Sequence, residues 1–292
     1  MRRSPSSVLD TPEALTAALA REAYVADEGL STAAFLALKL GKPLLIEGVP
    51  GVGKTEAAKA LASSLGRKLI RLQCYEGIDA AHALYEWNYP RQLLAIRKEK
   101  SDSLDLYTDD YLIERPLLAA LRAPEKGVLL IDEIDRADHE FEALLLEFLS
   151  DFQISIPERG TIKAKAPPVV VLTSNRTRDL HEALRRRCVY HWINYPDRET
   201  EAKIVMLRAP HVAKAAALAA VNAVQALRNL ALVKRPGISE AVEWATAADL
   251  LQAQGASLDD ALRRSIGVAL KEEDDLALVR DDLSGLIAES VR

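Results

Sequence analysis

Residues 48–55 read GVPGVGKT, directly after the apolar run 44–46 (LLI) and directly before a helical pattern that begins at Glu56. The string fits the phosphate-binding pattern G-x-x-x-x-G-K-[ST] in full, in the strand-loop-helix context that the pattern requires. Its glycines permit a tight loop with inward-pointing N–H groups, and the following helix presents the positive end of its dipole to an anion. A plain glycine-rich turn needs neither Lys54 nor Thr55. The stretch therefore predicts a site for nucleotide phosphates.

The residues of this loop have expected tasks. Lys54 should reach the β- and γ-phosphates, and the Thr55 hydroxyl should bind Mg²⁺. No N-K-x-D string occurs in the chain, so we expect ATP rather than GTP. The predicted nucleotide-binding residues of the loop are Gly48, Val49, Pro50, Gly51, Val52, Gly53, Lys54, Thr55 and Glu56.

A second element is the apolar run 128–131, which ends in the adjacent carboxylates Asp132 and Glu133. Ligands bind at the carboxyl ends of parallel strands, where such a pair would lie. Asp132 should hold Mg²⁺, usually through water, and Glu133 should polarise an attacking water as a general base. The alternative is an acidic pair that caps the next helix. Its position downstream of a phosphate-binding loop favours hydrolysis over binding alone.

Two polar elements follow. The apolar run 169–172 ends in Thr173-Ser174-Asn175, where Asn175 can orient the water or contact the γ-phosphate, or simply form an Asx turn. Further on, residues 185–187 are three consecutive arginines after a helical stretch. They are either a solvated face or the source of an arginine finger that acts on a neighbouring subunit.

The order of apolar patterns predicts an α/β domain followed by helices. Short apolar runs at 44–46, 69–72, 128–131 and 169–172 alternate with helical patterns at 56–65 and 141–149, which is typical of a parallel sheet. Upstream, a helix capped by Thr11 is expected to end near Gly29, before a second helix that reaches Gly41. From about Asp197 the strand signals stop, and Ala- and Leu-rich helical spacing predicts a smaller all-helical domain.

Composition limits the class of protein. The chain has 292 residues, with 38 Lys and Arg against 43 Asp and Glu, and the net charge of −5 argues against nucleic-acid binding. Two cysteines cannot form a disulfide framework, which favours a reducing compartment. The N-terminal MRRSPSSVLD lacks the apolar region of a secretory signal. The stretch between Lys214 and Arg228 is too short to span a membrane. We therefore expect a cytoplasmic protein without direct membrane insertion.

Taken in chain order, these parts resemble an AAA+ ATPase over nearly the whole chain. Four longer strings resemble the MoxR family and, within it, the CoxD-like branch. They are LLIEGVPGVGKTEAAKALA (44–62), YEWNYPRQLLAIR (85–97), LIDEIDRADHEFEALLLEFLSDFQISIPE (130–158) and LTSNRTRDLHEALRRRCVYHW (172–192). The resemblance implies an αβα core at 1–196, with an insert at about 75–110 and a hairpin at about 152–166, and a helical lid at 197–292. It also implies a homo-oligomeric ring, usually a hexamer, with ATP at each subunit boundary.

The resemblance also implies roles for single residues. Arg187 best fits the arginine finger, with Arg186 as the alternative. A sensor 2 arginine is expected near the start of a lid helix, where this sequence has Glu240; Arg235, just upstream, can take its place from the loop. The remaining matches are Gly48, Gly53, Lys54 and Thr55 in Walker A, Asp132 and Glu133 in Walker B, and Asn175 at sensor 1.

MoxR-type ATPases act as chaperone-like maturation factors, generally with a partner that carries a von Willebrand factor A domain. The CoxD-like branch is associated with the copper-sulfur-molybdenum site of carbon monoxide dehydrogenase, so the expected client is a metalloenzyme. The alternatives are an activase of another metalloenzyme (nitric oxide reductase or rubisco type), a chelatase-like motor, a nucleic-acid motor, or a nucleotide switch that does not hydrolyse ATP. Net charge argues against the nucleic-acid motor.

Two further groups have open interpretations. Tyr85, Trp87 and Tyr89 alternate and would share one face if extended, either to grip a client or to pack the insert onto the domain. The charges Arg159, Lys163 and Lys165 either contact an acidic client or form a solvated hairpin tip. A copper relay through Cys74, Cys188, His82 and His191 is not expected, because no pair has close ligand spacing.

Overall fold

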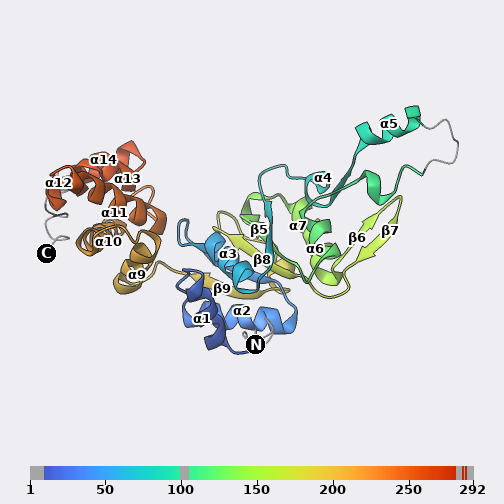
Figure 1. Ribbon diagram of the computed structural model, residues 1–292, viewed down its shortest axis with the longest axis horizontal. Helices are drawn as coiled ribbons and strands as arrows, with labels where there is room; N and C mark the ends of the chain where they lie inside the picture. The colour runs from blue at the N-terminus through green and yellow to red at the C-terminus, as the bar shows by residue number, and fades with distance from the viewer. Residues whose placement is uncertain (1–9, 99–104, 281–284, 286, 288–292) are drawn as a thin grey trace. The chain divides into compact units, whose positions relative to one another are not determined.

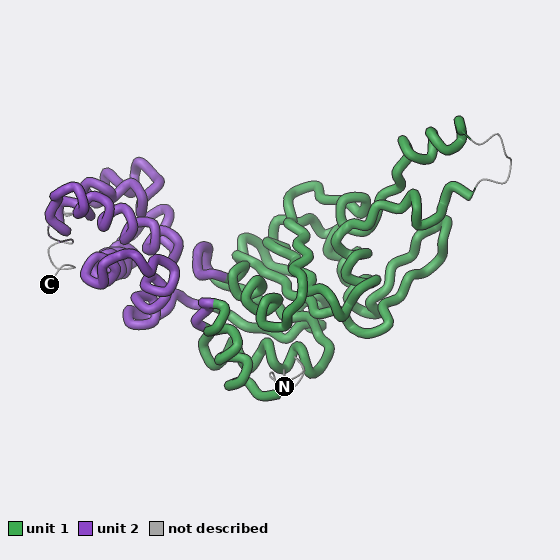
Figure 2. The backbone as a smooth tube through the Cα atoms, viewed as in Figure 1, with its two compact units in different colours: residues 1–22, 26–48, 54–193 green, residues 23–25, 49–53, 194–292 purple. Residues whose placement is uncertain are grey.

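The computed structural model describes residues 10–98, 105–280, 285 and 287. These residues form two compact units (Figure 2). Unit 1 takes the described residues of 1–22, 26–48 and 54–193, and unit 2 those of 23–25, 49–53 and 194–292. Most of the N-terminal stretch in which we expected no secretory signal, and residues 99–104 of the predicted insert, lie outside the described part. We retain the domain bounds 1–196 and 197–292 as a proposal.

Unit 1 is built on a five-stranded parallel sheet with the order β2-β5-β8-β1-β9 (Figure 1). All residues of the two strands β1 and β5 are buried, as expected where helices cover a parallel sheet. The apolar runs predicted as strands are confirmed as β1, β2, β5 and β8. The strand bounds are β1 (Leu44–Gly48), β2 (Lys68–Gln73), β5 (Gly127–Asp132), β8 (Val169–Ser174) and β9 (Val189–Ile193).

The helices of unit 1 pack on this sheet. Helix α3 lies against β1, β5 and β8, helix α6 against β2 and β5, and helix α2 against β1 and β9. Their bounds are α1 (Pro12–Arg21), α2 (Glu28–Leu40), α3 (Lys54–Ser64), α6 (Pro116–Arg122), the 3₁₀ helix η3 (Ile134–Arg136), α7 (His139–Asp151) and α8 (Glu182–Arg185). Helix α3 therefore begins within the phosphate-binding string, as the motif requires.

One predicted helix end is wrong. The first helix was expected to end near Gly29, but α1 ends at Arg21 and Gly29 lies in the first turn of α2. Ala23 has a left-handed backbone with φ 56°. The Asp27 carboxylate then accepts from the Leu30 N–H at 2.6 Å. Because an aspartate at this position satisfies a free N–H group of a first turn, it starts a new helix ahead of the glycine.

The insert between β2 and α6 forms its own small structure. Strands β3 and β4 pair antiparallel at its base, and helix α5 extends away from the sheet (Figure 1). The bounds are α4 (Ala80–Ala83), β3 (Tyr85–Trp87), α5 (Tyr89–Lys98), the 3₁₀ helix η2 (Asp109–Tyr111) and β4 (Leu112–Glu114).

The three alternating aromatics of the insert do not share one face. Tyr89 opens α5 and is 60% exposed, whereas Trp87 is 5% exposed. The Trp87 ring packs edge-on against Tyr85 and Tyr107, and its Nε1 donates to Glu158 Oε2 at 3.3 Å. Trp87 therefore anchors the insert, and the expected continuous row is wrong because the chain turns into a helix at Tyr89.

A two-stranded hairpin follows α7. Strands β6 (Gln153–Ile156) and β7 (Gly160–Lys163) pair antiparallel, within the stretch 152–166 where a hairpin was expected. Arg159 at its tip forms an ion pair with Asp109 of the insert, so this arginine already has an acidic partner in its own chain. Lys163 and Lys165 are exposed, and their contact with a client stays a prediction.

Unit 2 is helical throughout its long C-terminal part. Small alanines line its helices and allow close packing around Trp244, which is fully buried and donates from Nε1 to Leu262 O at 3.1 Å. The bounds are α9 (Arg198–Arg208), α10 (Lys214–Arg228), α11 (Ile238–Ala253), α12 (Leu258–Arg264), α13 (Ile266–Ala269) and α14 (Glu273–Arg280). Among the described residues, no helix has the length and hydrophobicity needed to cross a membrane.

A buried ion pair joins α9 to α10 in this unit. The Glu201 carboxylate accepts from Arg228 Nη1 and Nη2, both at 2.7 Å, and neither side chain is more than 6% exposed. Arg228 also donates from Nε to Pro236 O at 2.7 Å and stacks on the Tyr195 ring. The guanidinium therefore fixes the chain on both sides of α10.

We expect Glu201→Ala to lower the free energy of unfolding by about 3–5 kcal/mol, because it leaves the Arg228 charge buried without its carboxylate. Urea denaturation followed by circular dichroism measures the change. Glu199→Ala, at an exposed position on the same helix, is the matched control and should stay within about 0.5 kcal/mol of the unchanged protein. Equal unfolding midpoints for the two variants would contradict the prediction.

Candidate functional site

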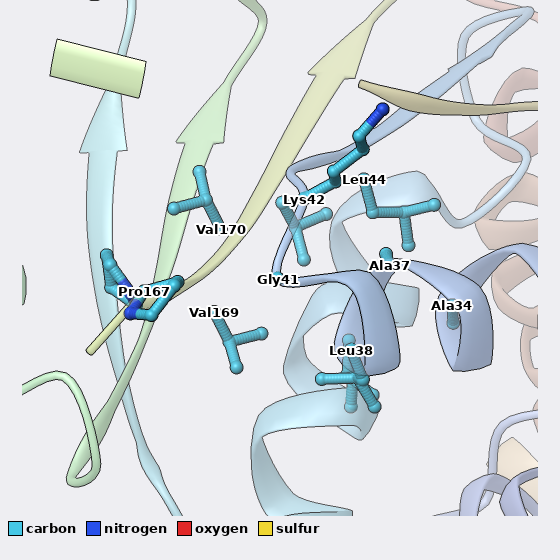
Figure 3. A pocket seen from close by; sticks show the side chains of 12 residues that line it. Ala34, Ala37, Leu38, Gly41, Lys42, Leu44, Pro167, Val169 and Val170 are labelled. Atoms are coloured by element: carbon cyan, nitrogen blue, oxygen red, sulfur yellow. The ribbon is translucent and has the colours of Figure 1, made fainter. Parts of the chain in front are cut away.

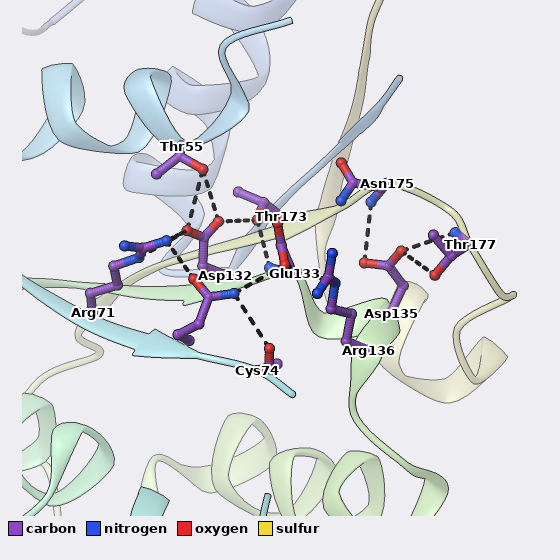
Figure 4. Close-up of polar contacts among 11 residues, drawn as sticks. Thr55, Arg71, Cys74, Asp132, Glu133, Asp135, Arg136, Thr173, Asn175 and Thr177 are labelled. Carbon is purple, nitrogen blue, oxygen red and sulfur yellow. Dashed lines mark hydrogen bonds and ion pairs between the residues drawn. The ribbon is translucent and has the colours of Figure 1, made fainter. Parts of the chain in front are cut away.

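The carboxyl ends of β5 and β8 and the start of α3 bring four polar side chains together (Figure 4). Thr55 lies in the first turn of α3, Asp132 ends β5, Glu133 follows it, and Thr173 lies near the end of β8. Thr55 Oγ1 donates to Asp132 Oδ1 at 3.0 Å, although the two residues are 77 positions apart. The predicted phosphate and carboxylate motifs are therefore in direct contact in this unit.

Lys54 lies beside this cluster and is 7% exposed. Its Nζ donates to Gly48 O at 2.8 Å, which turns the ammonium back over the start of the loop. Burial lowers the pKa of Lys54 to about 8, and the charges of Asp135, Asp132 and Glu133 oppose this effect. A buried ammonium with a lowered pKa is suited to an anionic ligand, which restores the charged form.

The lowered pKa gives a pH dependence with a defined sign. Above about pH 8 Lys54 loses its proton and with it the charge that attracts phosphates. We expect nucleotide affinity to fall by up to tenfold per pH unit above this value. Equilibrium binding of a fluorescent nucleotide from about pH 7 to about pH 10 measures it. Lys59→Ala removes an exposed ammonium from the same helix and is the control, which should keep the same dependence of affinity on pH. Nucleotide affinity that does not change with pH in the unchanged protein would contradict the prediction.

Asp132 is 1% exposed and is held by three side chains. Besides Thr55, its Oδ1 accepts from Thr173 Oγ1 at 2.5 Å. Its Oδ2 accepts from Arg71 Nε at 2.9 Å and from Arg71 Nη2 at 2.6 Å. Sequence reasoning assigned no role to Thr173 or Arg71. The polar residues within the run 68–73 were the available signal, since β2 lies next to β5 in the sheet.

Glu133 has an unusual backbone, with φ 55° and ψ 49°, the left-handed region that non-glycine residues rarely adopt. Its N–H donates to Thr173 Oγ1 at 2.9 Å, and its Oε2 accepts from Gln73 Nε2 at 3.1 Å and Arg136 Nε at 2.9 Å. Its side chain makes no cap bond to η3, and α7 is capped by Asp138 instead. The alternative that the acidic pair caps the next helix is therefore wrong.

Asn175 directly follows β8, and its loop is fixed by the buried Asp135. Asp135 accepts from the Asn175 N–H at 3.2 Å and from the Thr177 N–H and hydroxyl at 2.9 and 2.7 Å. Burial raises the pKa of Asp135, but these hydrogen bonds outweigh it, and the pKa is lowered overall. The ionised Asp135 thus ties the segment after β5 to the segment that carries Asn175.

The three consecutive arginines have different surroundings. Arg185 pairs with the buried Glu47 of β1 at 3.3 Å. Arg186, which directly follows α8, pairs with the exposed Glu182 of that helix, and Arg187 is exposed. Arg187 donates from Nε to Ser150 Oγ and from Nη1 to Ala183 O, both at 2.9 Å. Arg185 is therefore half-buried and engaged by its own unit, which leaves Arg186 and Arg187 as finger candidates.

The phosphate loop itself requires glycine. Gly51 and Gly53 have φ values of 79° and 89°, and a Cβ on Gly51 would lie 2.8 Å from Gly237 Cα. Within unit 2, Gly51 O accepts from the Ile238 N–H at 2.9 Å. Glu240, at the position where sensor 2 was expected, accepts from the Gly237 N–H at 3.0 Å. Glu240 therefore caps α11, and Arg235 lies exposed just upstream.

The remaining loop residues are placed as follows. Gly48 ends β1, and Glu56 lies in the first turn of α3, where it pairs with Lys59 at 2.7 Å. Val52 is buried at 3% exposure, and Pro50 O accepts from the Tyr195 hydroxyl at 3.5 Å. The segment Val49–Gly53 groups with unit 2.

The donor chemistry at Asp132 fits a hard divalent cation. A hydroxyl and a carboxylate supply the oxygen ligands that Mg²⁺ prefers, and Mg²⁺ commonly takes its other ligands from phosphates and water. No group of three or more His, Cys, Asp or Glu side chains that could hold a metal alone occurs among the described residues. The oxygen set therefore suits a metal that arrives with nucleotide phosphates.

Cys74 borders this site, because its backbone N–H donates to Asp132 O at 2.9 Å. Burial raises the pKa of both Cys74 and Cys188 to about 12, so both thiols stay protonated at neutral pH. His82 contacts Asp79 at 2.7 Å and His191 contacts Asp27 at 3.4 Å. A protonated thiol is a poor metal ligand.

A small apolar hollow lies at the opposite end of the strands, where β1 and β8 begin (Figure 3). It is lined by α2, α3 and the first residues of β1 and β8, with Lys42 as its charged residue. Because β1, β5 and β8 are parallel, their amino ends lie together at the hollow, whereas Asp132 and Thr173 lie toward the carboxyl ends of β5 and β8. The hollow is separate from the candidate site.

Comparison with known proteins adds relatives at low identity. The denitrification regulatory protein NirQ of Stutzerimonas stutzeri is 27% identical over 197 residues, which cover 65% of this chain and 65% of NirQ. The chaperone MoxR1 of Mycobacterium tuberculosis is 28% identical over 168 residues, which cover 56% of this chain and 39% of MoxR1. The chain thus matches less than two thirds of the length of either relative.

The fold is shared with a solved structure. The RuvB Holliday junction branch migration motor of Thermotoga maritima aligns over 88% of this chain and 69% of its own, with a TM-score of 0.50 and 19% sequence identity. At this identity the likeness is one of fold, and it confirms the parallel-sheet AAA+ core with C-terminal helices. The profile of the family described as "AAA domain (dynein-related subfamily)" matches residues 43–188, half of the chain. This chain belongs to the dynein-related subfamily of AAA domain proteins.

Proposed function

We propose that this protein is a MoxR-type AAA ATPase that hydrolyses ATP to remodel a client metalloenzyme. The observation that carries the proposal is the contact between the two motifs, in which Thr55 of the phosphate loop donates to Asp132 at 3.0 Å. Membership of the AAA domain family supports ATP as the nucleotide. The similarity to the chaperone MoxR1 supports action on another protein.

Each side chain has a proposed task in ATP turnover. Lys54 attracts the phosphates and stabilises charge that develops on them, and the N–H groups of the loop 48–53 orient them. Thr55 and Asp132 hold Mg²⁺ at the phosphates. When bound, Mg²⁺ neutralises phosphate charge and aligns the reacting groups. Glu133 accepts a proton from the attacking water, and Asn175 orients that water.

One carboxylate oxygen of Glu133 is engaged by two donors. Its Oε2 accepts from Gln73 at 3.1 Å and from Arg136 at 2.9 Å. Both donors hold this oxygen in place within the unit. We propose that ATP binding releases Glu133 from at least one of them.

We propose that the subunits form a ring, in which an arginine of one subunit completes the site of the next. Arg187 is the proposed finger and Arg186 the alternative, since both are exposed. Arg235 is the proposed sensor 2 substitute, since Glu240 is engaged at the start of α11. On the basis of the MoxR resemblance, we further propose that the ring is a hexamer and that it acts with a partner that carries a von Willebrand factor A domain. We also propose a cytoplasmic location.

Two clients are proposed. The CoxD-like strings favour the copper-sulfur-molybdenum site of carbon monoxide dehydrogenase. The alternative is an activase role toward another metalloenzyme, of the nitric oxide reductase or rubisco type, and the similarity to the denitrification regulatory protein NirQ supports a link to denitrification. Purified candidate clients, tested for a gain in enzyme activity that depends on this protein and on ATP, separate the two.

The first test is ATP turnover as a function of protein concentration, with assembly followed by light scattering. Turnover per subunit that rises as the protein assembles supports a ring ATPase with sites shared between subunits. Turnover per subunit that stays constant while the protein assembles contradicts sites shared between subunits. Tight ATP binding without turnover, with or without a client, identifies a nucleotide switch instead.

A further inference from the structure

The carboxylate of Asp132 has its acceptor capacity filled by protein donors (Figure 4). An ionised carboxylate offers about four lone-pair sites. Oδ1 accepts from the hydroxyls of Thr55 at 3.0 Å and Thr173 at 2.5 Å. Oδ2 accepts from Arg71 Nε at 2.9 Å and Arg71 Nη2 at 2.6 Å. A metal ion or a metal-bound water can reach this carboxylate only if one of these donors leaves.

The three partners differ in how easily they can leave. Thr173 is 1% exposed in β8, and its hydroxyl also accepts from the Glu133 N–H at 2.9 Å, so its position is fixed twice. Thr55 lies in the first turn of α3, and its hydroxyl is itself the proposed metal ligand. The Arg71 side chain is 48% exposed and reaches Asp132 from β2, the edge strand of the sheet. Arg71 alone can swing into solvent without a change in the backbone.

We propose that Arg71 is an internal counter-cation for Asp132, which the divalent cation of a metal–nucleotide complex displaces when it binds. The inference rests on the proposed function in one respect, that this site takes a nucleotide with Mg²⁺. A guanidinium and a hydrated divalent cation compete for the same oxygen lone pairs, and like charges at one carboxylate repel each other. Arg71 thereby sets the Mg²⁺ concentration at which nucleotide binds tightly.

Two opposite effects follow for Arg71→Gln. With the guanidinium gone, Asp132 is available to the metal, so the Mg²⁺ concentration at half-maximal tight binding falls by about tenfold. In EDTA no metal replaces the guanidinium, so the negative charge of Asp132 lies near the phosphates without a cation. Nucleotide affinity in EDTA therefore falls. The ratio of the affinities with and without Mg²⁺ therefore rises in the variant. A residue that only supports the fold would not move this ratio.

The experiment measures binding of a fluorescent, non-hydrolysable ATP analogue to the full chain across a Mg²⁺ titration and in EDTA. Arg71→Lys is the second variant. It keeps the charge but loses the bidentate contact. Its Mg²⁺ midpoint, the Mg²⁺ concentration at half-maximal tight binding, should lie between those of the unchanged protein and Arg71→Gln. Arg67→Gln is the matched control. It removes an arginine that directly precedes β2, where Nη1 donates to Pro124 O at 3.2 Å, and should leave the midpoint unchanged.

The outcomes separate the inference from the proposed function. A lower Mg²⁺ midpoint in Arg71→Gln, with Arg67→Gln unchanged, supports the inference. A midpoint that is unchanged or raised while the unchanged protein binds the analogue with Mg²⁺ overturns the inference and leaves the proposed function standing. Absence of analogue binding to the unchanged protein at any Mg²⁺ concentration overturns both. If Arg71→Gln does not fold, the midpoint of Arg71→Lys decides by the same criterion.

Discussion

Replacing Glu133 by Gln is expected to reduce ATP turnover by about 10²- to 10⁴-fold, the contribution of a positioned general base. The amide has nearly the same shape as the carboxylate but cannot take a proton from water. Nucleotide binding should persist, because Lys54, Thr55 and Asp132 are unchanged. Phosphate release gives the rate, and equilibrium binding of ATP gives the affinity.

The matched control for this prediction is Glu140→Gln, which makes the same chemical change at an exposed position of α7. It should keep turnover within twofold of the unchanged protein. Turnover of Glu133→Gln close to that of this control would remove Glu133 from the role of base. A loss of ATP binding in Glu133→Gln would instead show that Glu133 holds the nucleotide site together.

The second large effect is expected for Arg187→Ala, with a fall in turnover of about 10³-fold or more, the contribution of an arginine finger. Arg187 is exposed, and in this structure it is held by Ser150 and Ala183 through two hydrogen bonds of 2.9 Å. ATP binding to the variant should be unchanged, because a finger stabilises charge in the transition state rather than in bound ATP. Turnover and binding are measured as for Glu133→Gln.

Arg186→Ala is the matched control, one residue away. Its guanidinium pairs with Glu182 on the exposed surface of α8, where an ion pair contributes little. A large loss of ATP turnover in Arg186→Ala, with little loss of turnover in Arg187→Ala, would assign the finger role to Arg186.

Mixing the two inactive variants tests whether the finger acts between subunits. A Glu133→Gln subunit still carries Arg187, and an Arg187→Ala subunit still carries Glu133. Where the two alternate in a ring, each Glu133-containing site receives its finger from the other variant, so turnover should partly return. Mixed samples that assemble but stay inactive would show that Arg187 does not act in trans.

The sheet and the phosphate loop were predicted from the sequence because their signals are local. Continuous apolar runs mark strands that are buried on both faces, and β1 and β5 are buried along their whole length. The loop needs glycines at fixed positions, and Gly51 and Gly53 do have positive φ angles. Helix ends were less predictable, because the Asp27 cap gives a stronger signal than the glycine at which the helix was expected to end.

The partners of Asp132 were not predictable in the same way. Arg71 and Thr173 lie on the two strands that flank β5, far apart along the chain. Which side chain meets which depends on the order and register of the strands, and no local pattern records either. The arginine run shows the same limit, since Arg185 turns inward to Glu47 while its two neighbours are exposed.

By itself, the sequence determined the α/β class, the helical C-terminal part, the phosphate-binding loop and the acidic strand end, because backbone geometry and hydrophobic periodicity act over a few neighbouring residues. Only the tertiary structure decided that Glu133 takes a left-handed backbone beside Thr173, and that Arg71 occupies one carboxylate oxygen of Asp132. The physical reason is that hydrogen bonds and ion pairs act over about 3 Å, and such distances between remote residues exist only once the strands have paired.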